Sequence, residues 1–393
     1  MYMLSLDATK AFDKVQYTKL FNILIEREIC PLIIRLLLAI YSVSSAIVKW
    51  NNVKSDYFYI NNGVKQGGVI SAPLFALYVN PLLIRLQNCK QGCYMGNICA
   101  NAFAYADDFI ILAPTCTALN NIIVICEDYA KEYKVSYNPD KCTLLIFTSK
   151  EFYEFYFNNV NIFICGTKVM NLKSENHLGH IFNSTNNLID IQQVIRDIKV
   201  RTTVILNQFR CLSWQARVTL FISQCSSLYG CPLWNLDDPN VDKLCTAWKV
   251  CCRRIIGLKP DARYNLLHHL MNSLPIRDII MYRMLCFYKS GIHHENVTIA
   301  KFFKNSLLSN SSYAIMNVNT ILRHLKLDYS YVYTEYKKDR LKALFHNNMS
   351  KPDWRISMLT ELLDINDNLL SCDLNQEEVK TLIDHISRSR LYT

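Results

Sequence analysis

The chain opens with a short apolar run, residues 1–6, that ends on a single charged residue, Asp7. A run of this kind is typical of a buried strand, and here the strand carries a carboxylate at its tip. Apolar residues then recur at helical spacing from about 17 to 39, which predicts a long helix. The chain therefore begins with a strand followed by a helix.

The rest of the first half is predicted to alternate between strands and helices. The expected elements are a hairpin over 46–60 that turns at Asn51-Asn52, a helix over 71–87, a hairpin over 101–113, a helix over 117–136, a strand over 142–147 and a hairpin over 153–170 that closes near Gly166. This order indicates an α+β fold, an antiparallel sheet with helices packed on one face. We place this first domain at residues 1–185.

Beyond about residue 187 the pattern becomes mostly helical. We divide this part into a helical region at 186–300 and a helical C-terminal extension at 301–393. The extension has helix-like stretches around 315–327 and 353–370 and carries no chemical motif, so its role stays unknown.

Charge adds a possible partner to this picture. The sequence has 43 Lys and Arg against 33 Asp and Glu, a formal net charge of +10. That surplus suits a polyanionic partner, although many unrelated basic proteins share it. Part of it gathers between 196 and 217, on Arg196, Lys199, Arg201 and Arg210 among others. These residues are candidates for contact with a nucleic-acid backbone, as a thumb domain makes, or form a solvated helix face; charge counting does not choose between the two.

The cysteines and the longest apolar stretch bear on the compartment. The sequence has 16 cysteines, but its first residues lack the basic and apolar segments of an export signal. We therefore expect an intracellular protein, in the nucleus or cytoplasm and not secreted, whose thiols stay reduced and pack in the core. No C-x2-C pair indicates a zinc site. Residues 31–48 carry Arg35 and three serines, so they predict a core helix running into a strand and no membrane span.

Three aspartates are the chemical centre of the sequence. Asp7 and the pair Asp107-Asp108 lie far apart in the chain, yet each sits where a predicted strand ends or turns. Strands paired side by side would bring these carboxylates together. The pair interrupts apolar residues on both sides, where a charge carries a desolvation cost, so a functional role is favoured over an ordinary solvated turn. Clustered carboxylates need cations, and two Mg²⁺ ions about 3.5–4 Å apart can clamp the attacking and leaving oxygens of a phosphoryl transfer.

The segments around these aspartates resemble a known family. Four segments occur in the order of the reverse-transcriptase motifs A, B, C and D: LSLDATKAFDKV (4–15), GVKQGGVISAPLF (63–75), FAYADD (103–108) and NPDKCTLLIF (138–147). They most resemble the reverse transcriptases of non-LTR (LINE-type) retrotransposons. Three further segments match that family's primer grip and the region beyond the palm: HLGHIF (177–182), LYGCPLWNLDD (228–238) and KVCCRRIIGL (249–258). The resemblance covers roughly residues 1–290 and implies a polymerase palm followed by a mostly helical thumb.

The resemblance implies an RNA-directed DNA polymerase that adds deoxynucleotides to a primer 3′-hydroxyl. Asp7, Asp107 and Asp108 would be the catalytic residues and the ligands of two Mg²⁺ ions, for which Mn²⁺ can substitute. Phe12 takes the position of the steric gate that excludes a 2′-hydroxyl; a core phenylalanine is the alternative. Lys141 matches the lysine of motif D, a general acid for the departing pyrophosphate, with a solvated loop lysine as the alternative.

The resemblance also implies the partners: an RNA template, a DNA primer and deoxynucleoside triphosphates. Lys65, Gln66 and Gly67 fall where the family contacts the incoming nucleotide and the template, and a glycine there lets a ligand approach the backbone closely. Lys65 stands where many relatives carry Arg. Ala72 replaces the proline of the usual Ser-Pro pair, and His177 replaces the usual Tyr of motif E.

Some parts of the family pattern are not found in the sequence. No fingers subdomain precedes motif A, and no upstream endonuclease is seen, so we expect a truncated retroelement copy. Two hypotheses stand: a polymerase by descent, and a catalytically idle relic or nucleic-acid-binding remnant. An unrelated two-metal nucleotidyltransferase is a distant third, because it would not explain motif B.

Overall fold

The structure is a computed structural model that describes residues 1–184, 190–260, 267–309, 312–334 and 337–347. The chain divides into two compact units, residues 1–187 and residues 188–393. Each unit is described by itself.

The first unit is built on a five-stranded sheet. Its strands, in sheet order, are β13 (Met170–Leu172), β10 (Thr143–Ile146), β1 (Tyr2–Asp7), β9 (Asp108–Ala113) and β8 (Ala102–Tyr105). Strand β1 is central and runs antiparallel to β10 and β9. The predicted strands at 1–6, 101–113 and 142–147 are thereby confirmed. One detail of the predicted antiparallel sheet is wrong, because the edge strand β13 pairs parallel to β10. The chain between these two strands supplies the crossover that a parallel pair needs.

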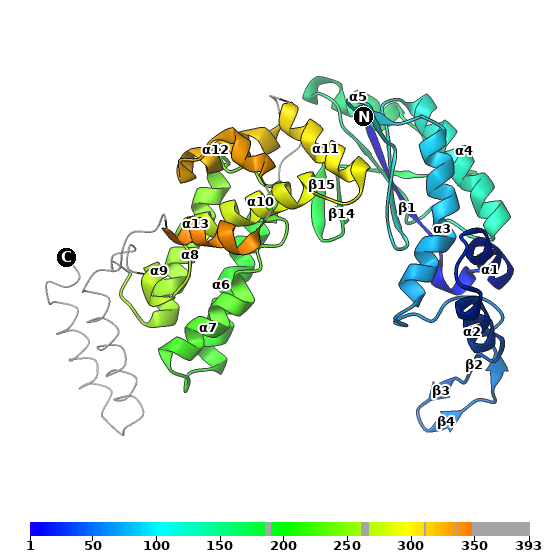
Figure 1. The fold of residues 1–393 in the computed structure, drawn as a ribbon, viewed down its shortest axis with the longest axis horizontal. Helices are drawn as coiled ribbons and strands as arrows, with labels where there is room; N and C mark the ends of the chain where they lie inside the picture. The colour runs from blue at the N-terminus through cyan, green and yellow to red at the C-terminus, as the bar shows by residue number, and fades with distance from the viewer. Residues whose placement is uncertain (185–189, 261–266, 310–311, 335–336, 348–393) are drawn as a thin grey trace, which may run out of the picture. The chain divides into compact units, whose positions relative to one another are not determined.

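Helices cover one face of this sheet, as Figure 1 shows for α3 (Ser71–Asn88) and α4 (Cys116–Tyr133). Leu4, Ile111 and Leu144 belong to the buried cluster that these helices complete. Alternate residues of the same strands, such as Met3, form a much smaller cluster on the other face. This period of two is what a sheet with one deeply buried face requires.

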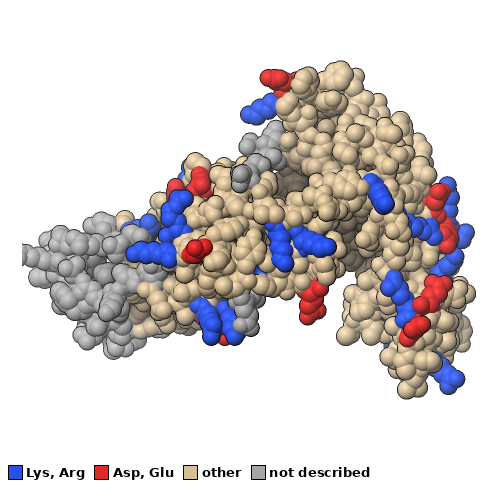
Figure 2. All heavy atoms as spheres, turned by 45° about the horizontal axis from the view of Figure 1, so that its top comes forward, with Lys and Arg blue, Asp and Glu red and all other residues tan. Residues whose placement is uncertain are grey.

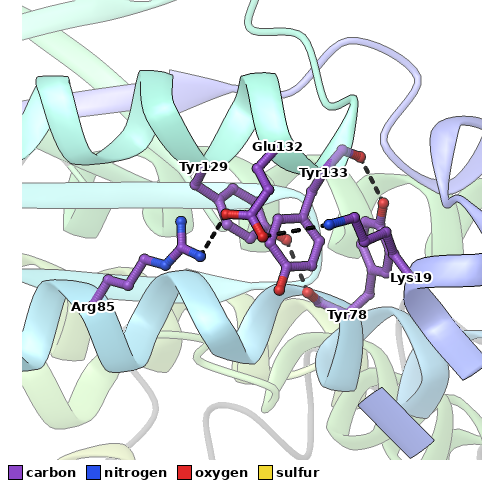
Figure 3. A network of polar contacts seen from close by, with 6 residues as sticks. All are labelled: Lys19, Tyr78, Arg85, Tyr129, Glu132 and Tyr133. Carbon is purple, nitrogen blue, oxygen red and sulfur yellow. Dashed lines mark hydrogen bonds and ion pairs between the residues drawn. The ribbon is translucent and has the colours of Figure 1, made fainter. Parts of the chain in front are cut away.

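A polar network holds the helices together behind the sheet (Figure 3). The fully buried Tyr78 of α3 donates its hydroxyl hydrogen to the Tyr133 carbonyl of α4 at 2.6 Å and accepts from the Gln16 backbone N–H at 3.3 Å. Glu132 of α4 accepts from Arg85 at 2.6 Å and from Lys19 at 3.4 Å. The Arg85 guanidinium holds the pKa of the Glu132 carboxyl below its usual range. The network links α3 and α4 to the segment that follows β1.

Two predicted elements of the first unit take a different form. The helix expected over 17–39 is two helices, α1 (Tyr17–Glu26) and α2 (Pro31–Ser42). Pro31 begins the second helix and disfavours helical backbone at the residue before it, which forces a break.

The first strand of the hairpin expected over 153–170 is wrong. Helix α5 (Lys150–Asn159) occupies that stretch, and only β11 (Phe163–Ile164) and β12 (Thr167–Lys168) pair around Gly166. The rings of Tyr153 and Phe157, 5.5 Å apart, meet one helical turn apart. Aromatic residues that favour strands are here used to pack a helix.

Short elements complete the first unit. A 3-10 helix, η1 (Phe12–Lys14), follows β1. The short paired strands are β2 (Ser45–Ala46) with β5 (Phe58–Tyr59), β3 (Lys49–Trp50) with β4 (Val53–Lys54), β6 (Cys93–Met95) with β7 (Ile98–Ala100), and β14 (Ser174–His177) with β15 (His180–Asn183). Pairing of Trp50 with Val53 confirms the predicted turn at Asn51-Asn52.

The second unit is helical, as predicted. Its described elements are α6 (Asp190–Gln208), α7 (Trp214–Cys225), η2 (Cys231–Leu233), α8 (Pro239–Ile256), α9 (Leu267–Leu270), α10 (Ile276–Ile292), α11 (Val297–Leu308), α12 (Tyr313–Leu325), η4 (Tyr329–Tyr333) and α13 (Lys338–Asn347). One buried cluster runs from Ile191 to Phe345. The described residues beyond 300 therefore share a core with those before it, because their apolar faces pack on α10. The helix-like stretch at 353–370 lies outside the described residues.

The thiols and the apolar helices match the expectations in part. All described cysteines are free, and several are buried, among them Cys126, Cys142 and Cys251, whereas Cys30 and Cys211 are exposed. Burial raises the pKa of the Cys142 thiol to about 11, so this thiol stays protonated near neutral pH. Among the described residues, no helix has the length and apolar character to span a membrane.

Candidate active site

Strand register brings two of the three aspartates together. Asp7 ends β1 and lies directly opposite Asp108, the first residue of the neighbouring strand β9. Asp107 lies in the turn between β8 and β9, next to Ala106, whose φ of 54° is left-handed. The turn was expected at Asp107-Asp108; it is one residue earlier, and Asp108 belongs to the strand. The three carboxylates thus come from one edge of the sheet.

The charges at this edge are unbalanced. Asp107 and Asp108 are exposed and Asp7 is half-buried. Like charges directly opposite one another destabilise a sheet unless something neutralises them. No salt bridge to these three carboxylates is found in the part of the chain that the structure describes. A bound cation would offset this repulsion.

The donor set fits a hard divalent cation, because carboxylate oxygens are the ligands that Mg²⁺ prefers. In the described segments, no three His, Cys, Asp or Glu side chains already form a group that could hold a metal ion. The aspartate side chains would therefore have to turn toward the ion on binding. Their exposure leaves room for that movement.

The backbone of Asp7 is fixed by the loop that follows α4. The Asn138 N–H donates to the Asp7 carbonyl at 3.0 Å, and the Thr9 N–H donates to Ser136 at 2.8 Å. Lys141 is exposed in the same loop, and its N–H donates to the Asn138 carbonyl at 3.1 Å. Motifs A and D are thus joined backbone to backbone, which places Lys141 on a turn anchored beside Asp7.

Phe12 joins motif A to motif B. Its ring is half-buried and stacks on Phe75 of α3, with ring centroids 4.5 Å apart and an interplanar angle of 17°. Its carbonyl accepts from the Val64 N–H at 2.8 Å. The ring therefore has a packing role in the structure, whether or not it also faces a sugar.

Gly63 allows the two motifs to approach closely. Its N–H donates to the Val15 carbonyl at 2.8 Å, its φ is +92°, and a Cβ added there would lie 2.8 Å from the Asp13 carbonyl oxygen. Gln66 donates to the Asp13 carboxylate at 3.5 Å. Asp13 lies inside η1. Sequence reasoning missed both contacts; the only signal was the single glycine that opens motif B.

A cleft of about 670 Å³ opens beside these contacts. Its walls include Asp13, Lys65 and Gln66, together with Tyr17, whose buried hydroxyl has no hydrogen-bond partner among the described residues. Gly67 has a φ of +77° and open space where a Cβ would point. The residues expected to contact a nucleotide and a template are therefore grouped at or beside one cleft.

The beginning of α3 tolerates the departure from the family pattern. Helix α3 starts at Ser71, whose hydroxyl donates to the Lys65 carbonyl at 2.5 Å. Pro73 falls within the first turn, where its missing N–H costs little. Ala72 in place of the usual proline therefore leaves the helix start intact.

The predicted motif E region forms a hairpin. His177 ends β14 and pairs with His180 of β15, with Leu178 and Gly179 in the turn at φ values of 49° and 77°. The His177 ring lies 6.4 Å from that of Phe182. The histidine that replaces the expected Tyr of motif E is thus the last strand residue before the turn.

The four basic candidates of the second unit differ in their surroundings. Arg196 and Lys199 are exposed on α6, and Arg210 is exposed beyond its end. Arg201 instead donates to the Gln224 carbonyl at the end of α7. On the face drawn in Figure 2, Lys and Arg side chains lie in small groups with acidic side chains among them.

Comparison with known proteins finds relatives of the first unit. Residues 1–182 match the family described as reverse transcriptase (RNA-dependent DNA polymerase). The Pol polyprotein of the retrotransposable element R2DM from Drosophila melanogaster is 28% identical over 141 residues, which cover 36% of this chain and 13% of that protein. The R2 polyprotein of Popillia japonica is 28% identical over 154 residues, 36% of this chain and 23% of that protein. The chain therefore matches only a small part of the length of these relatives.

A solved structure of apo telomerase from Candida tropicalis is similar at 12% sequence identity and a TM-score of 0.40, covering 77% of this chain and 53% of that one. At that level the likeness assigns no residue a role. The family match and the retrotransposon relatives carry the assignment. Residues 1–182 thus match the reverse-transcriptase family, and this part of the chain is similar to the Pol polyproteins of R2 retrotransposable elements.

Proposed function

We propose that this chain copies RNA into DNA by adding deoxynucleotides to the 3′-hydroxyl of a primer. The observation that carries the proposal is the register of β1 and β9, which sets Asp7 opposite Asp108 with Asp107 in the adjoining turn. The family match of residues 1–182 suggests the reaction type, and this sheet edge has the carboxylates that the reaction needs.

Each residue of the site has a role in the proposal. Asp7 and Asp107 are the principal metal ligands, and Asp108 supports them. Two Mg²⁺ ions, when bound, neutralise charge on the attacking and leaving oxygens of the phosphoryl transfer. Gln66 and Gly67 position the incoming nucleotide and the template at the cleft. The reaction depends on positioning and charge more than on covalent chemistry by the protein.

Two lysines complete the proposed site. Lys141 donates a proton to the departing pyrophosphate from its turn beside Asp7. Lys65 contacts the triphosphate as a point charge, a role that a lysine can fill where many relatives use arginine. In the second unit, Arg196, Lys199 and Arg210 contact the nucleic-acid backbone; Arg201 is assigned there with them, although its guanidinium also caps α7.

The first test separates metal binding from turnover. Mn²⁺ binding is followed by electron paramagnetic resonance, and extension of a primed RNA template is followed with Mg²⁺ and deoxynucleotides. Asp107→Asn should weaken Mn²⁺ binding and reduce extension about a hundredfold or more, because a charged ligand at the reacting oxygens is lost. Asp128→Asn on α4, an exposed residue paired with Lys131, is the matched control and should change neither.

Unchanged Mn²⁺ binding in Asp107→Asn would overturn the assignment of the site. Metal binding that depends on Asp107 without any extension would instead support the alternative, an idle relic. Nucleic-acid binding that survives in that case would identify the chain as a binding remnant.

We also propose that Phe12 excludes ribonucleotides. Phe12→Ala should raise the ratio of ribonucleotide to deoxynucleotide incorporation, because a ring that crowds a 2′-hydroxyl is removed. Phe75→Leu is the control, since it removes the stacking partner and keeps the Phe12 ring. An equal ratio in Phe12→Ala and the parent chain, with folding intact by circular dichroism, would leave Phe12 as a packing residue.

A further inference from the structure

An exposed hairpin of the first unit has aromatic rings that the proposed site does not use. We call residues 45–60 the aromatic hairpin; it contains β2 to β5, and β3 and β4 project beyond α2 in Figure 1. Trp50 is 78% exposed, Tyr57 80% and Tyr59 76%. Rings this large, gathered on one short element and left in water, mark a surface that binds something.

The charge of the aromatic hairpin indicates what kind of partner fits. Lys49 and Lys54 are directly opposite one another in the β3–β4 pairing, and both are exposed. Two like charges in that position repel, so an anion between or beside them would stabilise the pair. Trp50 pairs with Val53 and lies on the other face of the same two-stranded ribbon. Asp56 is the acidic residue within the hairpin, so the local charge is positive.

The aromatic hairpin is continuous with the cleft of the proposed site. Ser45, Ala46 and Ile60 at its base line the same cleft as Lys65 and Gln66. A single nucleic-acid strand that leaves this cleft along the hairpin base would reach the exposed rings. The hairpin base is closed by a further hydrogen bond, because the Ile60 N–H donates at 2.9 Å to the carbonyl of Ser44, which lies between α2 and β2.

We propose that the aromatic hairpin binds single-stranded nucleic acid, with bases stacked on Trp50 and on the tyrosine rings and with the backbone neutralised by Lys49 and Lys54. Every base has a π-face, so stacking of this kind tolerates any sequence. A duplex hides those faces, and an apolar protein surface would leave the lysine pair without a counter-charge. The proposal that the aromatic hairpin binds single strands depends only on its geometry. The further proposal that it guides the unpaired template to the polymerase site rests on the proposed function.

The test measures binding of the full chain to fluorescein-labelled oligouridylate, to oligo(dT) and to a blunt duplex by fluorescence anisotropy in EDTA. Trp50→Ala should weaken binding to the single strands about tenfold, in the range that loss of one base-aromatic stack produces. Trp50→Phe should restore most of the affinity, because it keeps a ring. Because position 50 is exposed, neither variant should change the folding of the chain, and circular dichroism checks this.

Charge variants test the second half of the proposal. Lys49→Gln should lower the slope of log affinity against log salt by about 1, as loss of one phosphate contact does. Asp56→Asn, which removes the negative charge, should tighten binding slightly. Asp128→Asn on α4 should leave binding in EDTA unchanged. Because EDTA removes the metal that the polymerase site needs, a failure of that site and a failure of the hairpin are told apart.

Several outcomes would overturn the proposal. Equal affinity of the parent chain and Trp50→Ala for both single strands would do so, as would a duplex preference that Trp50→Ala leaves intact. A shift in oligomeric size by light scattering in Trp50→Ala, without loss of oligonucleotide binding, would identify the surface as a protein contact instead. Loss of affinity for either single strand, restored by Trp50→Phe, supports the proposal.

Discussion

The two units of the chain place their charged residues by different means. In the first unit, Asp7 and Asp108 come together from distant parts of the sequence because β1 and β9 pair in one register. A slip of one residue would send one of them to the other face of the sheet. In the second unit, Arg196 and Lys199 lie on the exposed side of one helix, and their spacing alone fixes where they are. Strand pairing therefore holds like charges close together in spite of their repulsion, whereas an exposed helix face carries charged side chains in water with little electrostatic cost.

The largest effect that would sharpen this comparison is expected at Gly63. Gly63→Ala forces a Cβ to within 2.8 Å of the Asp13 carbonyl oxygen at a φ of +92°. The strain of that backbone and the contact together should lower the free energy of unfolding by about 2–4 kcal/mol. Denaturant unfolding monitored by circular dichroism measures the loss.

Gly166→Ala is the matched control for Gly63. Gly166 also has a left-handed φ, +78°, but a Cβ there meets nothing within 4 Å. It should cost only the conformational strain, about 1–2 kcal/mol. Equal losses in the two variants would mean that the close approach between motifs A and B does not hold the site together.

A smaller effect is expected where the first unit buries a hydroxyl. Tyr78→Phe removes the donor to the Tyr133 carbonyl and the acceptor of the Gln16 N–H, leaving both backbone groups without that partner. Buried polar groups left unpaired cost about 1–3 kcal/mol, which thermal and denaturant unfolding would detect. Tyr94→Phe loses a similar bond, from an exposed ring to the Lys90 carbonyl, and should cost about 0.5 kcal/mol or less. A Tyr78→Phe variant as stable as Tyr94→Phe would show that this network does not support the site.

Prediction from the sequence worked best where charged residues interrupt an apolar segment. Asp107 and Asp108 interrupt apolar residues, and the pattern around them located the hairpin and the sheet edge to within one residue. It failed where tertiary packing overrides local preference. Tyr153 and Phe157 favour a strand by residue type but stack along α5.

Other features have no signal in the pattern. The apolar pattern beyond residue 300 does not show that these helices pack on α10. The predicted boundary between 300 and 301 therefore separated residues that share one core. The fit of Gly63 against Asp13 depends on a backbone approach between two distant segments, which no periodicity encodes. Such contacts become visible only in three dimensions.

The smallest effects are expected in the second unit, where a pair of neighbouring basic residues can test the comparison directly. Arg201 of α6 donates to the carbonyl of Gln224, which lies in the last turn of α7. Lys199 lies two residues before Arg201 on α6 and is exposed. A cation at a helix C-terminus is worth about 0.3–1 kcal/mol, so Arg201→Gln should lower the free energy of unfolding by that amount. Lys199→Gln should leave stability unchanged, because surface charges away from such contacts matter little. If Lys199 contacts a phosphate, its loss should instead reduce the salt dependence of oligonucleotide binding by a slope of about 1, measured by anisotropy over a salt titration. Opposite readouts for two residues on the same helix would separate a structural cation from a binding one. If Lys199→Gln binds oligonucleotides with the same salt dependence as the parent chain, Lys199 makes no phosphate contact and this face of α6 is only solvated.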